Sequence, residues 1–303
     1  MKARVCLLGQ GDIAHAMARM LVNVELVCSP EDEPQGPTVR RSSTWEEALD
    51  GSRVVVLAAN ADRLAELAER YGPHALGDHV VVTAARGMRA GFELPHETIR
   101  RYTCARKIGV FGGPLHAQEV AAEHHATVVL ASRFREAARV VDTLVPEERV
   151  TVEHTTDLVG VGVAGAYGHV TSVLTGMGQA LSWTPTAVGL LVAHGMVEAR
   201  NLGVAAGGEP ATYQGIVGWG ELIPRTQGRS NRHGELGAAL VQGGERPAGQ
   251  LEVLTTLRES MRFGQTHDIA TPVADALHRV VDSQEEAASA LGALLRSPLD
   301  PRH

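Results

Sequence analysis

The chain has 303 residues, of which 44% are hydrophobic and 21% charged, a balance typical of a folded globular protein and not of a collagen-like or disordered one. Its 28 Lys and Arg residues face 35 Asp and Glu residues, which gives a formal net charge of −7. A negative balance argues against nucleic acid and anionic membranes as partners.

The three cysteines, Cys6, Cys28 and Cys104, are far apart and form no CxxC pair. This pattern argues against disulfides and against a cysteine metal site, and it favours the reducing cytoplasm. The sequence contains neither an evident signal peptide nor a run of 18 apolar residues, so we expect neither export nor membrane insertion.

The first half of the chain alternates short β-branched runs with helical patterns, as parallel α/β domains do. The expected strands are residues 3–8, 24–28, 53–58, 79–83, 107–111, 126–130 and 150–153. Apolar residues at three- and four-residue spacing predict helices over residues 13–21, 61–71, 116–123 and 135–144.

After about residue 153 the strand patterns cease and helical ones take over, at residues 158–181, 186–202, 248–266 and 273–295. The predicted fold class is therefore α/β, with an N-terminal Rossmann-type parallel-sheet domain followed by an all-α domain. We place the dinucleotide-binding domain at residues 1–153 and the helical domain, for substrate binding and dimerisation, at residues 154–303. Ligands are expected in a cleft between the two.

The first expected strand runs directly into a GxGxxA motif. Gly9 can make the tight turn, Gly11 lets the backbone approach a pyrophosphate, and Ala14 permits close packing of helix on strand. The helix begins around Asp12 and Ile13, where free N–H groups and the positive dipole end favour phosphate. These five residues are the predicted binding turn for NAD or NADP.

The end of the second strand should select between NAD and NADP, because an acidic side chain there accepts from the ribose hydroxyls whereas arginine pairs with the extra phosphate. Ser29, Glu31 and Asp32 favour NAD. Arg40 and Arg41 follow in the neighbouring segment and could bind the phosphate of NADP. The sequence leaves this choice open, with a slight preference for NAD.

Beyond the glycine turn the chain resembles the NAD(P)-dependent glycerol-3-phosphate dehydrogenase family along nearly its whole length. The similar stretches are VTAARG at residues 82–87, GGPLHAQEV at 112–120, residues 157–170, residues 195–203, and GIVGWGEL at 215–222. The resemblance implies a Rossmann domain, a helical substrate domain and hydride transfer between a nicotinamide and the carbinol carbon of a small, usually phosphorylated, three-carbon substrate. It also implies a homodimer.

The family's cofactor-side residues carry over well. The resemblance places the cofactor-contacting alanine on Ala117, the arginine that holds phosphate and cofactor on Arg232, and a cofactor-contacting glutamate on Glu252. The close backbone approach is kept at Gly113. The lysine of the family's Lys-Gly pair is Arg86, which keeps the charge but replaces a point charge with a planar fork.

The substrate-side positions depart from the family. Its catalytic lysine, in Ala-Leu-Lys-Asn, falls on Gly168, and the asparagine that follows falls on His169. A serine that would bind substrate is Leu115. The aspartate of the family's Gly-Asp-Leu motif is Glu221, which lies in a glycine-flanked apolar loop where a chance surface acid is less expected.

Further departures flank these positions. The family's Ser-Arg-Asn becomes Asn231 and His233 on either side of the retained arginine, and His116 follows the Gly-Pro turn, where it faces either the cleft or water. The substrate-facing set is Arg86, Gly113, Leu115, His116, Asn231 and His233. The adjacent pair His124 and His125 has no Asp, Glu or Cys partner at ligand spacing, so no metal site is expected.

Reduction of a ketone needs a group that protonates the developing alkoxide, and glycine at 168 has no proton to give. The nearest replacement is His169, although side chains at 168 and 169 point about 100° apart on a helix. Tyr167, His116, His233 and Arg86 remain alternatives. We assign His169, Glu221 and Arg86 as the candidate catalytic residues.

Three hypotheses follow. The first is a cytoplasmic NAD(P)-dependent oxidoreductase whose substrate end is remodelled for another small hydroxy or keto compound, favoured to be anionic. The second is a catalytically silent NAD(P)-binding sensor or partner protein, motivated by the loss of the lysine. The third, ranked last, is an unmodified glycerol-3-phosphate dehydrogenase in which Arg86 substitutes for lysine.

Overall fold

The structure is a computed structural model that describes residues 3–33, 38–114, 124–226, 232–243 and 251–299. It divides into two compact units, one comprising Met1–Arg86 with Leu94–Gly162 and the other Gly87–Glu93 with Val163–His303. The chain enters the second unit for residues 87–93, returns to the first, and passes finally into the second within one long helix, Leu158–Ala180. The domain boundary that we expected after residue 153 lies inside the last strand of the first unit, Val150–Thr155.

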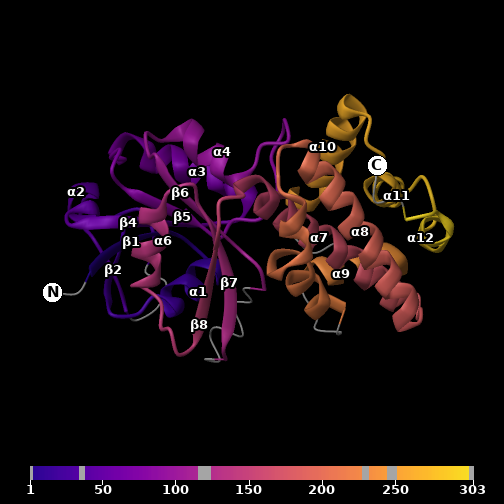
Figure 1. Ribbon diagram of the computed structural model, residues 1–303, viewed down its shortest axis with the longest axis horizontal. Coiled ribbons are helices and arrows are strands. Elements are labelled where there is room, and N and C mark those ends of the chain that lie inside the picture. The colour runs from indigo at the N-terminus through magenta and orange to yellow at the C-terminus, as the bar shows by residue number, and fades with distance from the viewer. Residues whose placement is uncertain (1–2, 34–37, 115–123, 227–231, 244–250, 300–303) are drawn as a thin grey trace. The chain divides into compact units, whose positions relative to one another are not determined.

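The first unit is built on one sheet, whose eight described strands follow the order β3-β2-β1-β4-β5-β6-β7-β8 (Figure 1). Neighbouring strands are parallel except β6 and β7, which pair antiparallel. The strands are β1 (Ala3–Gly9), β2 (Val24–Cys28), β3 (Val39–Arg41), β4 (Ser52–Ala58), β5 (Val80–Thr83), β6 (Lys107–Gly112), β7 (Ala126–Ala131) and β8 (Val150–Thr155). The 3-2-1-4-5-6 part of this order is that of a Rossmann sheet, which confirms the predicted fold class.

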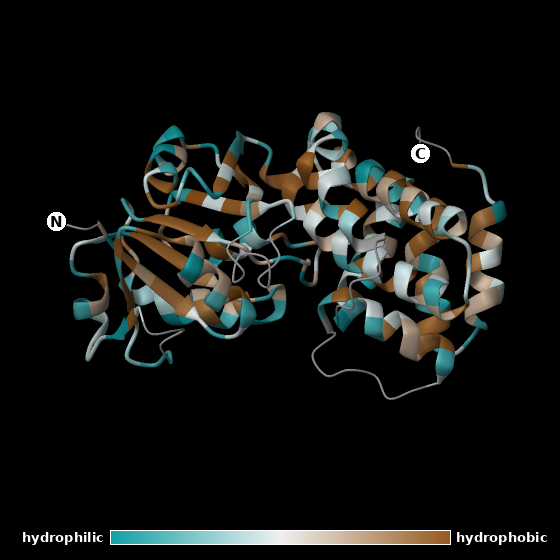
Figure 2. Cartoon of the chain, turned by 90° about the horizontal axis from the view of Figure 1, so that it is seen from below, coloured by the Kyte–Doolittle hydropathy of each residue, from teal (hydrophilic) through white to brown (hydrophobic). Residues whose placement is uncertain are grey.

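Helices cover both faces of this sheet. Side chains alternate along β1, so that Val5 and Leu7 pack with α1 and α6 on one face while Cys6 and Leu8 pack with α2, α3 and α4 on the other. The strands are correspondingly hydrophobic in Figure 2. The helices of this unit are α1 (Asp12–Met20), α2 (Trp45–Leu49), α3 (Ala61–Tyr71), α4 (Pro95–Tyr102) and α6 (Arg135–Asp142), with a 3₁₀ turn η1 at Gly72–His74.

All seven expected strands form, each within two residues of its predicted ends. The sequence missed β3, which has three residues, two of them arginine, and so lacks an apolar alternation. It also missed the short helices α2 and α4. Thr44 caps α2 by accepting from the Glu47 backbone, and Pro95 starts α4 at a position where no N–H is needed. The helix expected over residues 116–123 falls outside the described residues.

The second unit is helical. Its elements are α7 (Leu158–Ala180), which begins in the first unit, α8 (Pro185–Ala205), α9 (Arg232–Gln242), α10 (Leu251–His267), α11 (Pro272–Val281), α12 (Ala287–Arg296) and the short turns η2 (Pro210–Gln214), η3 (Ile216–Gly220) and η4 (Ile223–Thr226). The helical pattern over residues 273–295 is divided between two helices: α11 ends at Val281 and α12 begins at Ala287. The break passes through Ser283, whose φ of 57° is left-handed, and residues 282–286 (Asp-Ser-Gln-Glu-Glu) contain no apolar residue.

Helix α7 is the core element of this unit. Among the described helices it is long and apolar enough to cross a membrane by length and composition, but 94% of its apolar window is buried inside the protein. A helix that is apolar all round and covered by other helices is the usual centre of a helical domain. Its composition therefore reflects packing.

Candidate active site

The glycine turn has the backbone that a dinucleotide loop requires. Gly9 has φ of 111°, and a Cβ there would lie 2.1 Å from the Ala58 carbonyl oxygen on β4, so both the turn and the contact with β4 require glycine. Gly11 has φ of 84° and no atom within 4 Å of an added Cβ. Helix α1 starts at Asp12 and no described side chain caps it. Its first N–H groups are thus suited to an anion.

The position of this turn within the sheet also favours a ligand site. It lies at the carboxyl end of β1, between β2 and β4, where the order of strands reverses direction. Ile13 is partly buried and Ala14 is fully buried against the sheet, as close helix packing requires. The cofactor roles of Gly9, Gly11, Asp12, Ile13 and Ala14 stay predictions, and the geometry is compatible with all of them.

The acidic residues after β2 interact with the protein's own donors. Asp32 is buried and accepts hydrogen bonds from Ser29 Oγ and Arg70 Nη2, each at 2.8 Å. Glu31 accepts from Trp45 Nε1 at 3.0 Å. Because Asp32 is buried and already hydrogen-bonded, it is a poor acceptor for ribose hydroxyls.

The two neighbouring arginines differ. Arg40 pairs with Glu47 at 2.6 Å, whereas Arg41 donates from Nε to the Asp32 carbonyl oxygen at 2.9 Å and remains on the exposed end of β3. Neither the acidic nor the basic set is arranged to exclude the other cofactor, so the choice between NAD and NADP stays open.

Two of the predicted substrate residues lie together in the first unit. Arg86 Nη2 donates to the Gly113 carbonyl oxygen at 2.7 Å. Gly87 and Gly113 both have positive φ, 105° and 87°, so each turn depends on glycine. The Arg86 guanidinium is thereby held at the turn that follows β6, where the sequence predicted the close backbone approach.

Glycines bring α7 and α9 into backbone contact in the second unit. A Cβ on Gly176 of α7 would lie 2.0 Å from the Gly234 carbonyl oxygen. A Cβ on Gly237 of α9 would lie 2.1 Å from the Val173 carbonyl oxygen. Such close approach is open only to residues without a side chain. It places the N-terminal part of α9 beside the C-terminal half of α7.

This contact assembles a cluster of His169 from α7, His233 from α9 and Glu252 from α10, which we call the His-His-Glu cluster. The two imidazoles stack with ring centroids 4.0 Å apart and planes 14° apart. His233 Nε2 lies 3.1 Å and His169 Nδ1 3.7 Å from Glu252 Oε1. All three side chains are buried. The sequence singled out each residue for a different role, and the fold brings them together.

Glu252 is the centre of the cluster and is 0% exposed. Its Oε1 also accepts from Arg232 Nη2 at 3.0 Å. It lies in the first turn of α10, where the helix dipole favours a carboxylate. Its Oε2 is buried and has no hydrogen-bond partner among the described residues. The cluster thus joins a carboxylate to two imidazoles and leaves one carboxylate oxygen for a further ligand.

Glu221 is buried in the same unit and follows the π-helical turn η3. A Cβ on Gly218 in this turn would lie 2.0 Å from the Tyr213 carbonyl oxygen, so the turn is packed tightly against the preceding 3₁₀ segment. π-Helical turns are rare in proteins, and those that occur are often found at functional sites. Because Glu221 is buried, it is not a chance surface acid. Its catalytic role stays a prediction.

Four predicted site residues, Leu115, His116, Ala117 and Asn231, fall outside the described residues. Sequence reasoning did not connect Glu252 with the two histidines, because the role expected for it was contact with the cofactor. The signal that finds the cluster is that both residues replacing the family's asparagines, at 169 and 233, are histidine. Since the three residues come from three helices, sequence spacing alone does not join them.

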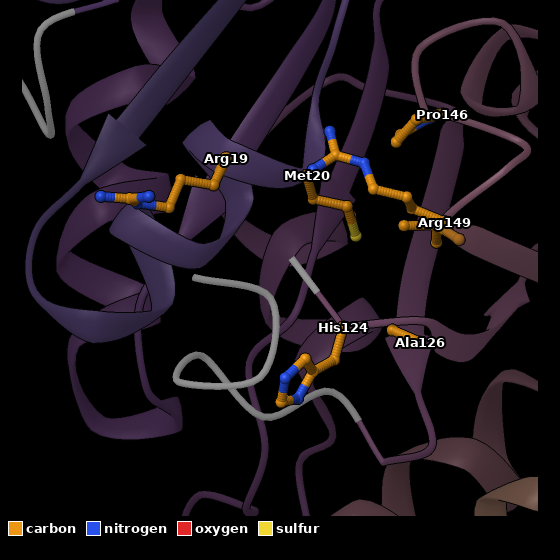
Figure 3. A pocket seen from close by; sticks show the side chains of 7 residues that line it. Arg19, Met20, His124, Ala126, Pro146 and Arg149 are labelled. Atoms are coloured by element: carbon orange, nitrogen blue, oxygen red, sulfur yellow. The ribbon is translucent and has the colours of Figure 1, made fainter. Parts of the chain in front are cut away.

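The first unit also has a pocket that is lined by none of the candidate site residues discussed above. Figure 3 shows it, lined by Arg19, Met20, His124, Ala126, Pro146, Arg149 and Val150. It includes neither a residue of the glycine turn nor one of the His-His-Glu cluster. His124 borders it, and the neighbouring His125 contacts Thr151 Oγ1 at 3.2 Å. We assign the pocket no part in the candidate active site.

Comparisons with known proteins agree with this architecture. Residues 32–138 match the family model for the N-terminus of NAD-dependent glycerol-3-phosphate dehydrogenase, and residues 157–292 match the model for its C-terminus. A glycerol-3-phosphate dehydrogenase (NAD(P)+) of Thermus thermophilus is 31% identical over 257 residues, which cover 82% of this chain and 78% of the relative. One of Salinibacter ruber is 29% identical over 261 residues, covering 81% and 74%.

The crystal structure of glycerol-3-phosphate dehydrogenase from Coxiella burnetii superposes with a TM-score of 0.87 and 21% identity, over 98% of this chain and 99% of that one. This likeness shows the same fold. Together with the family models and the relatives, it establishes that the chain belongs to the NAD-dependent glycerol-3-phosphate dehydrogenase family.

Proposed function

We propose that this protein is an NAD(P)-dependent oxidoreductase that transfers hydride between the nicotinamide and a small, anionic hydroxy or keto compound other than glycerol 3-phosphate. Family membership supports the dehydrogenase chemistry and a dinucleotide cofactor, NAD or NADP. The observation that carries the substrate shift is the His-His-Glu cluster, which includes His169, the residue that follows Gly168 in α7, where the family resemblance places the catalytic lysine.

In reduction, a hydride carrying two electrons leaves the dihydronicotinamide for the carbonyl carbon. The carbonyl π pair moves to oxygen, and that oxygen then takes up one proton to give the alcohol. A positively charged or proton-donating group beside the oxygen lowers the barrier to this step. Gly168 has no such group, so we assign stabilisation of the oxygen to the His-His-Glu cluster. Arg232 and Arg86 are the charges suited to the anionic part of the substrate.

The competing proposal is a silent NAD(P)-binding protein, favoured by the absence of a lysine at 168. Both proposals predict cofactor binding through the glycine turn. Only the enzyme predicts that NADH or NADPH is oxidised in the presence of a carbonyl compound.

The test is a panel of small 2-keto acids, keto phosphates and aldehydes, each assayed with NADH and NADPH. We expect turnover of at least one compound, lost in His169→Ala and in Glu221→Gln but kept in His278→Ala, which removes a half-buried histidine at the end of α11. Tight NADH binding with no oxidation anywhere in the panel would establish the silent protein.

Residence in the cytoplasm and assembly as a homodimer stay predictions, as does the absence of nucleic-acid and membrane partners. We propose the homodimer from the family resemblance. Its mass in solution, measured by light scattering, tests it directly.

A further inference from the structure

We propose that the His-His-Glu cluster binds one divalent transition-metal cation, of which Zn²⁺ is the type. One ligand atom from each of His169, His233 and Glu252 lies within 4.8 Å of the other two, and all three residues are buried. Two imidazoles and one carboxylate form a set that binds zinc and non-haem iron, whereas Mg²⁺ and Ca²⁺ prefer oxygen ligands alone.

The second observation is the state of the Glu252 carboxylate. Its Oε2 atom is buried and has no hydrogen-bond partner among the described residues, while Oε1 accepts from Arg232 and contacts both histidines. A buried carboxylate oxygen without a donor is unfavourable and calls for an ion or a water molecule. A cation at Oε2 satisfies this atom and leaves the hydrogen bond from Arg232 to Oε1 in place.

The charges around the cluster decide which cations fit. Arg232 is cationic, but its side chain is 47% exposed, so water screens its charge. The first turns of α9 and α10 also direct their positive dipole ends toward His233 and Glu252. The charge of Arg232 and the two helix dipoles disfavour a weakly held cation such as Na⁺ or Mg²⁺. Only a cation that forms strong bonds to imidazole nitrogen, as transition metals do, can overcome this repulsion.

The histidine geometry makes a specific demand. A metal lies close to the plane of each imidazole that binds it, and two rings stacked 4.0 Å apart cannot both meet that condition. Binding therefore requires one ring to turn out of the stack about its side-chain torsions. The stack seen between His169 and His233 should be absent from the metal-bound protein, which a crystal structure would show.

The catalytic part of this inference rests on the proposed function. A bound cation supplies the positive charge that the family's lysine supplies and that Gly168 cannot. Held there, the cation would act as a Lewis acid toward the substrate carbonyl. The oxygen that gains the electron pair when hydride reaches carbon then takes a proton from solvent water, and the product leaves as the neutral alcohol.

The experiment uses the full chain, stripped with a chelator and titrated calorimetrically with Zn²⁺ and, separately, Mg²⁺. We expect one equivalent of Zn²⁺ to bind with a dissociation constant of about 1 μM or tighter, and no binding of Mg²⁺. His169→Asn and His233→Asn, which introduce the residue that the family has, should each weaken Zn²⁺ binding by at least about tenfold. His278→Asn, which alters a surface His-Asp pair, is the matched control and should leave binding unchanged.

The outcomes separate the two proposals. Zinc binding that is unaffected by His169→Asn and His233→Asn, or no binding, overturns the metal site. Site-specific binding in a protein that reduces no carbonyl compound leaves the metal site standing and overturns the proposed function. Turnover that is equal in chelated and zinc-loaded protein overturns the Lewis-acid role. Circular dichroism of each variant shows whether the fold is kept.

Discussion

Gly9 and Gly11 stand two residues apart in one turn, yet they should respond differently to alanine. A Cβ on Gly9 meets the Ala58 carbonyl oxygen at 2.1 Å, so Gly9→Ala should cost roughly 3 kcal/mol or more of stability. Gly11 has open space, so Gly11→Ala should cost only about 1 to 2 kcal/mol, from its positive φ. The methyl group of the introduced alanine would occupy the predicted pyrophosphate position. Gly11→Ala should therefore also raise the Kd for NADH by about tenfold or more.

Urea unfolding and NADH fluorescence titration measure these two effects. Unchanged NADH affinity in folded Gly11→Ala protein would place the cofactor elsewhere.

Asp32 is a buried carboxylate whose charge is balanced by Arg70 on α3. Arg70→Ala leaves that charge with Ser29 Oγ but without its cation, and should lower the free energy of unfolding by about 2 to 4 kcal/mol. Arg63→Ala, an exposed position on the same helix, should change it by less than about 0.5 kcal/mol. Equal effects in chemical denaturation would mean that the ion pair contributes nothing.

The contact between α7 and α9 is the element on which the His-His-Glu cluster depends. Gly237→Ala puts a methyl group 2.1 Å from the Val173 carbonyl oxygen, so we expect a loss of about 2 to 4 kcal/mol. Gly189→Ala, in an open position on α8, should instead stabilise by about 0.5 to 1 kcal/mol. Opposite signs in thermal unfolding would support the close approach, whereas two stabilising changes would contradict it.

The elements of the first unit could be predicted because their physics is local. A parallel strand that is buried on both faces must be a continuous apolar run. The runs Val54 to Leu57 and Val80 to Val82 have this composition and therefore predict buried strands. Strand β3 could not be predicted, because two of its three residues are arginine. The break between α11 and α12 could have been predicted, since residues 282–286 (Asp-Ser-Gln-Glu-Glu) interrupt the apolar spacing. It is Ser283 in the left-handed region that ends the helix.

The candidate site likewise has one part that local sequence predicts and one part that it does not. The glycine turn is a local motif and was predictable from six consecutive residues. The His-His-Glu cluster depends on a contact between Gly176 and Gly234 whose partners are far apart in sequence. His169 and His233 were each found as departures from the family, but their stacking, and the carboxylate between them, follow only from helix packing.

Across the whole molecule, Glu198 gives stability a dependence on pH. This buried carboxyl accepts from Tyr167 Oη at 2.8 Å and from the Val273 and Ala274 backbone N–H groups, and so ties α7, α8 and α11 together. Burial raises the pKa of Glu198 from 4.5 to about 7, against the opposing effect of these hydrogen bonds.

Between pH 4.5 and about 7 the folded protein therefore holds a proton that the unfolded chain has released. Raising the pH through this window should lower the free energy of unfolding, by about 3 kcal/mol from this group alone. Glu198→Gln cannot titrate and should flatten the dependence. Denaturant unfolding at several pH values measures both slopes, and parallel slopes would exclude Glu198 as the cause.

The most direct test of the proposed function is the initial rate of NADH and NADPH oxidation with dihydroxyacetone phosphate, compared with the rates for the panel of small keto compounds. If Gly168 and the His-His-Glu cluster replace the family's substrate end, as we propose, turnover of dihydroxyacetone phosphate should be slow or undetectable and turnover of another anionic keto compound faster. A rate with dihydroxyacetone phosphate of about 10 to 1,000 per second, ordinary for an enzyme acting on its own substrate, would contradict the remodelled site.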